Sequence, residues 1–369
     1  MAGRAPAWVL ALLLVAQTPD TRARQLYERA IRLEQRGNDA AALSLLWEAA
    51  GLAPADGVIQ DALGQGLERI GALDAAVEAY RRAAAARPPA RGAANHLVLG
   101  LVKAGRAADA IALARSAVEA APADAEGWFT LGLAQSDVDA DAAIDSFHRA
   151  IAIDPRHVLA RYNLALVLYH ADKPDAALDE LRQALAIQPR PEIHYTLGIV
   201  RWHRGDLDGA VDALEAAVAA NPSYADAHLA LGTVLKARGD LPRAAASLRR
   251  AVALAPAQAA PHIVLAQTLA LAGDREGARR ESLESDRLRR DAGRAQEAAT
   301  LTAAGTEKLD AGDAGAAADC FRRATQALDT FAPAHYQLGR ALDRLGQHDA
   351  ARAAYQRARQ LNPALVPPR

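Results

Sequence analysis

Apolar residues recur along this chain in short blocks, separated by polar positions at helical spacing. One block reads AAIDSFHRAIAIDP and ends at Pro155, and the next reads AALDELRQALAIQP and ends at Pro189. In both blocks the apolar side chains return every three or four residues, which is the spacing of one face of an α-helix. The pattern predicts an all-α protein built from many short amphipathic helices.

Prolines and glycines divide these blocks into a regular unit. Proline lacks the amide hydrogen and clashes with a preceding helical turn, whereas glycine, and less often aspartate, takes the left-handed backbone that ends many helices. The first seven prolines of the series are 33 or 34 residues apart: Pro54, Pro88, Pro122, Pro155, Pro189, Pro222 and Pro256. The turn residues between them and beyond are Gly37, Gly71, Gly105, Asp139, Asp172, Gly205, Gly239, Gly273, Gly312 and Gly346. The unit is therefore two helices of about fourteen residues each, joined by a tight turn.

Small residues at fixed positions predict where these helices cross, because small side chains let two helix axes approach closely. Near the start of each second helix stand Ala42, Ala76, Ala110, Ala143, Ala177, Ala210, Ala244, Ala278, Ala317 and Ala351. Seven residues later stand Ala49, Ala83, Ala117, Ala150, Ala184, Ala217, Ala251, Ser285, Ala324 and Ala358. The first helices carry Ala30, Gly64, Gly132, Ala165, Gly198, Gly232, Ala266, Gly305 and Gly339, with Val98 as the exception.

The chain resembles the tetratricopeptide repeat family, whose 34-residue unit carries W-x2-L-G and then A, F, A and P. Trp128-Phe-Thr-Leu-Gly132, followed by Ala143, Phe147, Ala150 and Pro155, matches this pattern closely. Ten units in register cover residues 23–365. The resemblance implies a right-handed α-solenoid of stacked helix pairs, with the first helices lining a concave face.

The pattern falters once, after Gly273. The second helix of the eighth unit, residues 275–290, is rich in arginine and glutamate, and no proline closes it. The sequence therefore predicts a longer, solvated helix here. It also predicts repeats 1–8 at residues 23–292, an irregular insertion or hinge at 293–297, and repeats 9 and 10 at 298–365.

The first residues differ from the rest. Arg4 precedes an apolar run at residues 7–16, and the chain then turns polar. A short positive start and a short apolar centre are typical of a secretory signal peptide. We expect residues 1–16 to be a signal peptide of an exported, periplasmic protein. The alternative is a retained helix that packs on the first repeat of a cytoplasmic protein.

Composition narrows the function. Lysine and arginine number 43 against 44 acidic residues, which argues against a groove that binds nucleic acid phosphates. Cys320 is the only cysteine, and the sequence holds no catalytic or phosphate-binding motif. We expect no enzyme activity and no cofactor. No segment beyond the first residues approaches a membrane span.

Histidines at repeat spacing raise the question of metal binding. His194, His228 and His262 are 34 residues apart, and His335 occupies the same place in the tenth unit. Packed helices lie about 8–10 Å apart, whereas a metal–nitrogen bond is about 2 Å long. These histidines are therefore expected to pack between repeats, without a metal.

Aromatic residues indicate a candidate binding surface. Seven of the sixteen aromatic residues fall between Trp128 and Trp202. By the family resemblance, side chains on the first helices of repeats 4–6 point into the concave groove, and aromatic side chains often dominate binding energy. The candidate partner-binding residues are Phe129, Tyr162, Tyr169, His170, Tyr195, Trp202 and His203, with Lys236 and Arg344 as charges at the rim. The alternative is that these rings only fill a tight inner curve.

The sequence thus predicts a non-enzymatic scaffold that binds a peptide or protein segment in its groove. The family resemblance implies work in a bacterial envelope assembly. The alternative is an accessory subunit of a glycan-synthesis, export or other envelope enzyme whose catalytic part lies on another chain. RNA binding by helical repeats is a further class, and the balanced charge argues against it.

Overall fold

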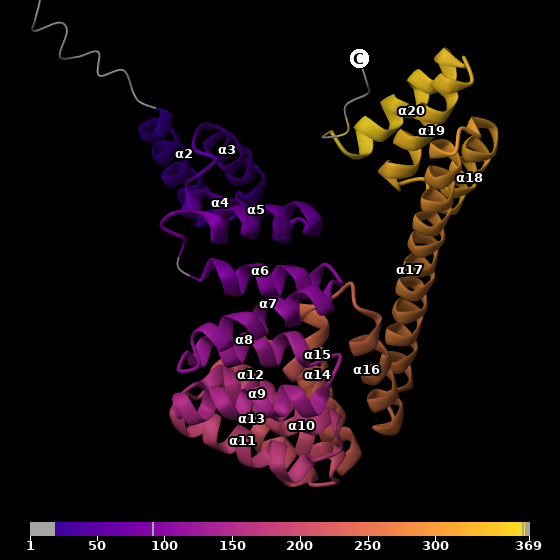
Figure 1. Ribbon diagram of the computed structural model, residues 1–369. Helices are drawn as coiled ribbons and strands as arrows, with labels where there is room; N and C mark the ends of the chain where they lie inside the picture. Colours follow the sequence, from indigo (N-terminus) through magenta and orange to yellow (C-terminus); the bar gives the residue numbers. More distant parts are fainter. Residues whose placement is uncertain (1–18, 91, 364, 366–369) are drawn as a thin grey trace, which may run out of the picture. The chain divides into compact units, whose positions relative to one another are not determined.

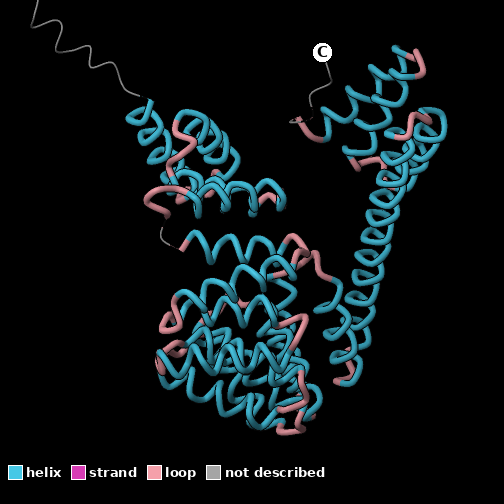
Figure 2. Tube along the Cα trace, in the orientation of Figure 1, coloured by secondary structure: helices cyan, strands magenta, loops and turns pink. Residues whose placement is uncertain are grey.

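The structure is a computed structural model that describes residues 19–90, 92–363 and 365. These residues form 19 α-helices and no strand, and Figure 2 traces them as helices joined by short loops. The predicted all-α solenoid of helix pairs is confirmed. The predicted signal peptide, residues 1–16, lies outside the described residues.

The chain divides into two compact bodies, an N-terminal body that ends at Arg204 and a C-terminal body that begins at Gly205. Figure 1 labels their helices in chain order. The N-terminal body holds α2 (Pro19–Glu34), α3 (Asp39–Leu52), α4 (Gly57–Arg69), α5 (Leu73–Ala85), α6 (Ala93–Lys103), α7 (Ala107–Ala120), α8 (Ala125–Gln135), α9 (Ala140–Ile153), α10 (Val158–His170), α11 (Pro174–Ile187) and α12 (Pro191–His203). The C-terminal body holds α13 (Leu207–Ala220), α14 (Ala225–Arg238), α15 (Leu241–Leu254), α16 (Ala259–Leu271), α17 (Arg275–Asp310), α18 (Ala314–Ala327), α19 (Ala332–Arg344) and α20 (His348–Leu361).

The alanines predicted as crossing points are buried in both bodies. Ala177 and Ala184 on α11, and Ala244 and Ala251 on α15, expose none of their surface. Ala117 and Ala278 are the half-buried exceptions. Since each helix pair buries its apolar face only against its neighbours, these contacts supply the cohesion of the array.

Where the two helices of a pair cross, the side chains that meet are matched in size. A methyl group added at Gly132 would lie 2.6 Å from Cε1 of Phe147, so glycine is required where an aromatic ring crosses. The same pairing joins Gly64 to Tyr80, Gly305 to Phe321, and Gly339 to Tyr355. In repeat 5 the crossing pair is Ala165 and Leu181, both fully buried. Leucine therefore accommodates the extra methyl group in repeat 5, whereas in repeat 7 a methyl group added at Gly232 would lie 2.5 Å from Cγ of Leu248.

The turns inside the pairs use left-handed backbone, as expected. Gly205 has φ of 81°, and Asp172 takes the same region with φ of 58°. Asp139 was predicted to do likewise, but its φ is −149°. It instead caps α9, because its carboxylate accepts a hydrogen bond from the amide of Ala142 at 3.0 Å.

The longest helix is α17, with 36 residues. The predicted irregular segment at residues 293–297 is wrong, because α17 continues through it. Most other second helices carry a large buried residue four positions after the crossing alanine, as Phe147 and Leu248 do, whereas α7 carries the small Ala114 and α17 the polar Ser282. Without an apolar side chain at this position, folding back would bury little apolar surface. No proline ends the helix here.

Two further observations bear on function. Cys320 is buried on α18. Of the helices in the described part of the chain, none combines the length and the apolar character that a membrane crossing requires.

Candidate functional site

The candidate site lies on α10 and α12 of the N-terminal body. Tyr162 and Tyr169 on α10 are seven residues apart, as are Tyr195 and Trp202 on α12. Seven residues make about two helical turns, so each pair lies on one helix face. All four rings are half-buried, which fixes their positions while leaving part of each ring accessible to a ligand.

Hydrogen bonds hold these two first helices side by side. The hydroxyl of Tyr162 lies 3.2 Å from Oγ1 of Thr196. The Thr196 hydroxyl donates its own proton to the carbonyl of Glu192 at 3.0 Å, so Tyr162 is the donor of the bond between the helices. A second bond joins the hydroxyl of Tyr169 to Nδ1 of His203. The lone pairs of Tyr162 remain able to accept a hydrogen bond from a ligand.

Four rings form a continuous row across the two helices. Tyr169 lies 5.3 Å from His170 and 5.6 Å from His203, centroid to centroid, and His203 lies 5.6 Å from Trp202. The rings of Tyr169 and His203 are stacked, with 28° between their planes. Contacts at these distances favour a fixed arrangement of the rings. The two histidines are exposed, so the row presents both apolar faces and polar nitrogens.

The ionic groups around this row are already paired. Arg161 of α10 is buried and forms a 2.7 Å ion pair with Glu180. Arg204, which follows α12, pairs with Asp175 at 2.5 Å. The site therefore offers rings, hydroxyls and imidazoles rather than free charge. Such a surface suits an uncharged, partly apolar segment better than a phosphate.

Three candidates lie elsewhere. Phe129 of α8 is buried, with its ring centroid 4.9 Å from that of His157 and 6.1 Å from that of Phe147. Phe129 belongs to the core between helices, because removing the apolar surface of a phenyl ring from water is favourable. Lys236 belongs to the C-terminal body and donates to Gln267 at 2.7 Å, and Arg344 of the same body donates to the carbonyl of Leu309.

Polar side chains in repeats 1–3 form pairs between first helices, and sequence reasoning missed this pairing. Asp61 of α4 lies 2.7 Å from Nδ1 of His96 on α6. On the same helices Glu68 pairs with Lys103, and Arg69 of α4 pairs with Glu34 of α2. These partners are 35 residues apart, and that recurrent spacing of opposite charges was the available signal. Because these charges bind one another, this part of the face has fewer groups left for a ligand.

The histidine series has a structural role. Nε2 of His262 lies 3.3 Å from the carbonyl oxygen of Pro256, and Nε2 of His228 lies 3.2 Å from that of Pro222. His335 makes the equivalent contact with the carbonyl of Asp329 at 2.8 Å. Within the described residues no group of three or more His, Cys, Asp or Glu side chains is arranged to hold a metal ion. These histidines link each first helix to the turn before it.

Comparisons with known proteins identify the repeat. Models of the tetratricopeptide repeat match residues 95–136, 136–198, 195–259, 229–286 and 332–365. No curated protein matches the chain significantly.

Solved structures are similar at low identity. PilF of Pseudomonas aeruginosa is 21% identical, with 54% of this chain and 91% of PilF covered and a TM-score of 0.48. YrrB, a TPR protein with an unusual peptide-binding site, is 21% identical, with 47% and 91% covered and a TM-score of 0.43. A human IFIT1 dimer with m7Gppp-AAAA is 15% identical, with 94% of each chain covered and a TM-score of 0.44.

Proposed function

This chain belongs to the tetratricopeptide repeat family, and from that premise we propose that it is a non-enzymatic scaffold whose α10 and α12 bind an extended peptide segment of a partner protein. The observation that carries the proposal is the row of Tyr169, His170, His203 and Trp202. Rings fixed before binding lose little entropy when a ligand arrives. The family supports protein interaction as the general function.

The chemistry of this row of rings favours a segment with proline or apolar side chains. Tyr169 and Trp202 offer ring faces, on which an extended proline-rich segment packs well. The hydroxyl of Tyr162 can accept a hydrogen bond from a backbone amide of that segment. A single-stranded RNA would also stack on aromatic rings, but it needs cations along its backbone, and Arg161 and Arg204 are engaged with carboxylates.

The test uses peptides selected by phage display on the purified full-length chain, followed by fluorescence anisotropy with the selected sequences. Tyr169→Ala and Trp202→Ala are each expected to weaken binding by about tenfold or more, because hot-spot aromatic residues contribute at least about 1.4 kcal/mol. Trp47→Ala is the matched control, since Trp47 is 52% exposed on α3, outside the groove. Unchanged affinity in both groove variants, or equal loss in the control, contradicts the proposal. Oligo(A) RNA that competes with the peptides would favour the nucleic acid class.

We further propose that the scaffold is exported and serves a bacterial envelope assembly. The support is the apolar run at residues 7–16 after Arg4. Fusing residues 1–40 to alkaline phosphatase without its own signal tests export, because that enzyme is active only after export to an oxidising compartment. Activity is expected from this fusion and not from one that lacks residues 1–16. Equal activity of the two fusions contradicts export. Crosslinking and mass spectrometry of envelope fractions would separate a scaffold from an accessory subunit of an envelope enzyme.

A further inference from the structure

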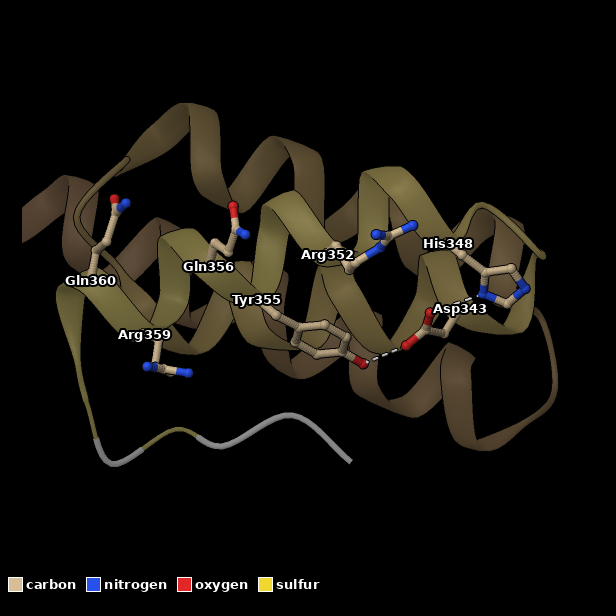
Figure 3. A pocket seen from close by; sticks show the side chains of 7 residues that line it. All are labelled: Asp343, His348, Arg352, Tyr355, Gln356, Arg359 and Gln360. Atoms are coloured by element: carbon tan, nitrogen blue, oxygen red, sulfur yellow. Dashed lines mark hydrogen bonds and ion pairs between the residues drawn. The ribbon is translucent and has the colours of Figure 1, made fainter. Parts of the chain in front are cut away.

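A hollow of about 630 Å³ lies on the last helix pair of the C-terminal body, α19 and α20. Asp343 from the end of α19 and Tyr355, Gln356 and Arg359 from α20 are among its lining residues. Figure 3 shows Asp343 between Tyr355 and His348, with a hydrogen bond to each. The hollow is separate from the row of rings on α10 and α12.

Tyr355 forms the floor of this hollow. Its side chain is buried against α19, where a methyl group added at Gly339 would lie 2.6 Å from its Cε1 atom. Its hydroxyl donates a 2.9 Å hydrogen bond to Oδ2 of Asp343. Burial, followed by this hydrogen bond, raises the pKa of Tyr355, so the phenol remains a donor at neutral pH. Asp343 therefore keeps one oxygen directed toward the exposed His348, which is 3.3 Å away.

Repeat 2 contains the same arrangement in the N-terminal body. Tyr80 crosses Gly64 as Tyr355 crosses Gly339. The hydroxyl of Tyr80 donates to Oε2 of Glu68 at 3.2 Å, as that of Tyr355 does to Asp343. The two sites thus share a tyrosine, a glycine and a carboxylate at equivalent repeat positions.

The difference is that a further helix covers the site in repeat 2. Gly100 of α6 approaches the other edge of Tyr80, and a methyl group there would lie 2.9 Å from its Cδ2 atom. Three residues later, the ammonium group of Lys103 pairs with Glu68. Within the described residues no helix follows α20, and the equivalent surface is the hollow. Repeat 2 therefore shows which residues can cover such a surface: a glycine against the tyrosine ring and a lysine that pairs with the carboxylate.

We propose that the hollow docks an amphipathic α-helix of another protein, with a small residue against Tyr355 and a lysine or arginine three residues later that pairs with Asp343. The small residue is required because even a methyl group at the place of Gly100 would lie 2.9 Å from the tyrosine ring, so glycine fits the closest approach. Arg352 and Arg359 lie along the exposed face of α20, where Arg352 already pairs with Asp349. Arg359 therefore favours a partner helix that carries an acidic residue on the adjoining side.

A second copy of this chain fits the hollow poorly. Its first described helix, α2, carries the exposed Arg32 two residues after the crossing Ala30, which is the place that Gly100 occupies on α6. A long charged side chain there prevents the close contact with tyrosine. On α20 three arginines, Arg352, Arg357 and Arg359, stand against one acidic residue, Asp349, so two copies that met through this helix would bring an excess of like charge together.

The probe is a labelled synthetic peptide of residues 92–106, which contains the α6 sequence, titrated with the full-length chain by fluorescence anisotropy. We expect saturable binding. Asp343→Lys in the chain, or Gly100→Leu in the peptide, should weaken it by about tenfold or more. A peptide with Lys103→Asp should recover affinity for the Asp343→Lys chain, because the charges are exchanged.

A second pair of variants protects the test against misfolding. Gln356 and Ala353 are both exposed on α20, but only Gln356 lines the hollow. Gln356→Trp should block the peptide while Ala353→Trp leaves binding unchanged, with helicity checked by circular dichroism.

Three results would overturn the inference. The first is absence of saturable binding at about 1 mM peptide. The second is binding that survives Asp343→Lys but is lost with Glu68→Lys, which would mean that the peptide exchanges with α6 in repeat 2. The third is a dimer of the full-length chain in sedimentation that Asp343→Lys dissociates, because the occupant would then be a second copy. None of these results depends on the groove residues Tyr169 and Trp202, so this proposal and the peptide groove fail independently.

Discussion

The indole nitrogen of Trp128 donates a 2.9 Å hydrogen bond to the carbonyl oxygen of Pro122, six residues earlier in the chain. The same link recurs between repeats with different donors: Gln60 to Pro54, Arg161 to Pro155, His228 to Pro222, and His262 to Pro256. The repeat position therefore selects for a nitrogen donor rather than for an aromatic ring. In these repeats the bond joins the first helix to the turn that precedes it, whereas Leu26, Ala94 and Leu301 occupy the position in repeats 1, 3 and 9.

Replacing Trp128 with phenylalanine should destabilise the chain by about 1 kcal/mol, because the Pro122 carbonyl loses its donor while most of the ring packing remains. Replacing Trp128 with histidine should destabilise the chain less, because histidine is the native hydrogen-bond donor at this position in other repeats. Urea unfolding followed by circular dichroism measures the difference. If histidine and phenylalanine cost the same, the hydrogen bond contributes little.

The match between Gly132 and Phe147 predicts a compensating pair. Gly132→Ala alone should destabilise by about 1–3 kcal/mol, because its methyl group would lie 2.6 Å from the ring of Phe147. Adding Phe147→Leu should recover part of this loss, since Ala165 and Leu181 form that pair in repeat 5. A double-mutant cycle on unfolding midpoints gives the coupling. Strictly additive effects would show that the two side chains do not share this space.

Two histidines should give opposite pH dependences. A hydrogen bond to Asp61 raises the pKa of His96, whereas burial lowers the pKa of His228. The stability from His96 is fully present below the unfolded pKa of about 6.5 and is lost as pH rises through the raised folded value. For His228 the unfolded chain binds the proton more readily, so stability falls as pH drops below about 6.5.

The measurement is the free energy of unfolding at pH 5 and pH 8 for His96→Asn and His228→Asn. His96→Asn should cost more at pH 5 than at pH 8. His228→Asn should remove part of the wild-type loss at pH 5. Equal costs of both variants at the two pH values would contradict the assigned shifts.

Sequence reasoning succeeded where a contact repeats and failed where it is unique. Ala177 and Ala184 were predicted to be buried because the same helix crossing recurs in every repeat. Phe129 was placed in the groove by its position, yet its burial depends on Phe147 and His157, a combination particular to repeat 4. The family resemblance placed Tyr169 and Trp202 on the faces of first helices that were expected to line the groove. The bond between Tyr169 and His203 depends on the packing of α10 against α12, which no local pattern specifies.

The continuity of α17 gives the last prediction. Gly293 is exposed in the middle of this helix, and a methyl group added there would meet no atom within 4 Å. Gly293→Ala should therefore stabilise the chain by about 0.5–1 kcal/mol, because alanine loses less backbone entropy in a helix.

Gly312, in the turn after α17, is the matched control. It has equally open surroundings but a φ of 89°, so Gly312→Ala should destabilise by about 1–2 kcal/mol. Thermal unfolding followed by circular dichroism compares the two variants with the parent chain. A loss of stability in Gly293→Ala would mean that residues 293–297 leave the helix. If Gly293→Ala stabilises the chain and Gly312→Ala destabilises it, backbone conformation rather than free space decides the direction of the stability change. That result is expected only if α17 continues unbroken through residues 293–297.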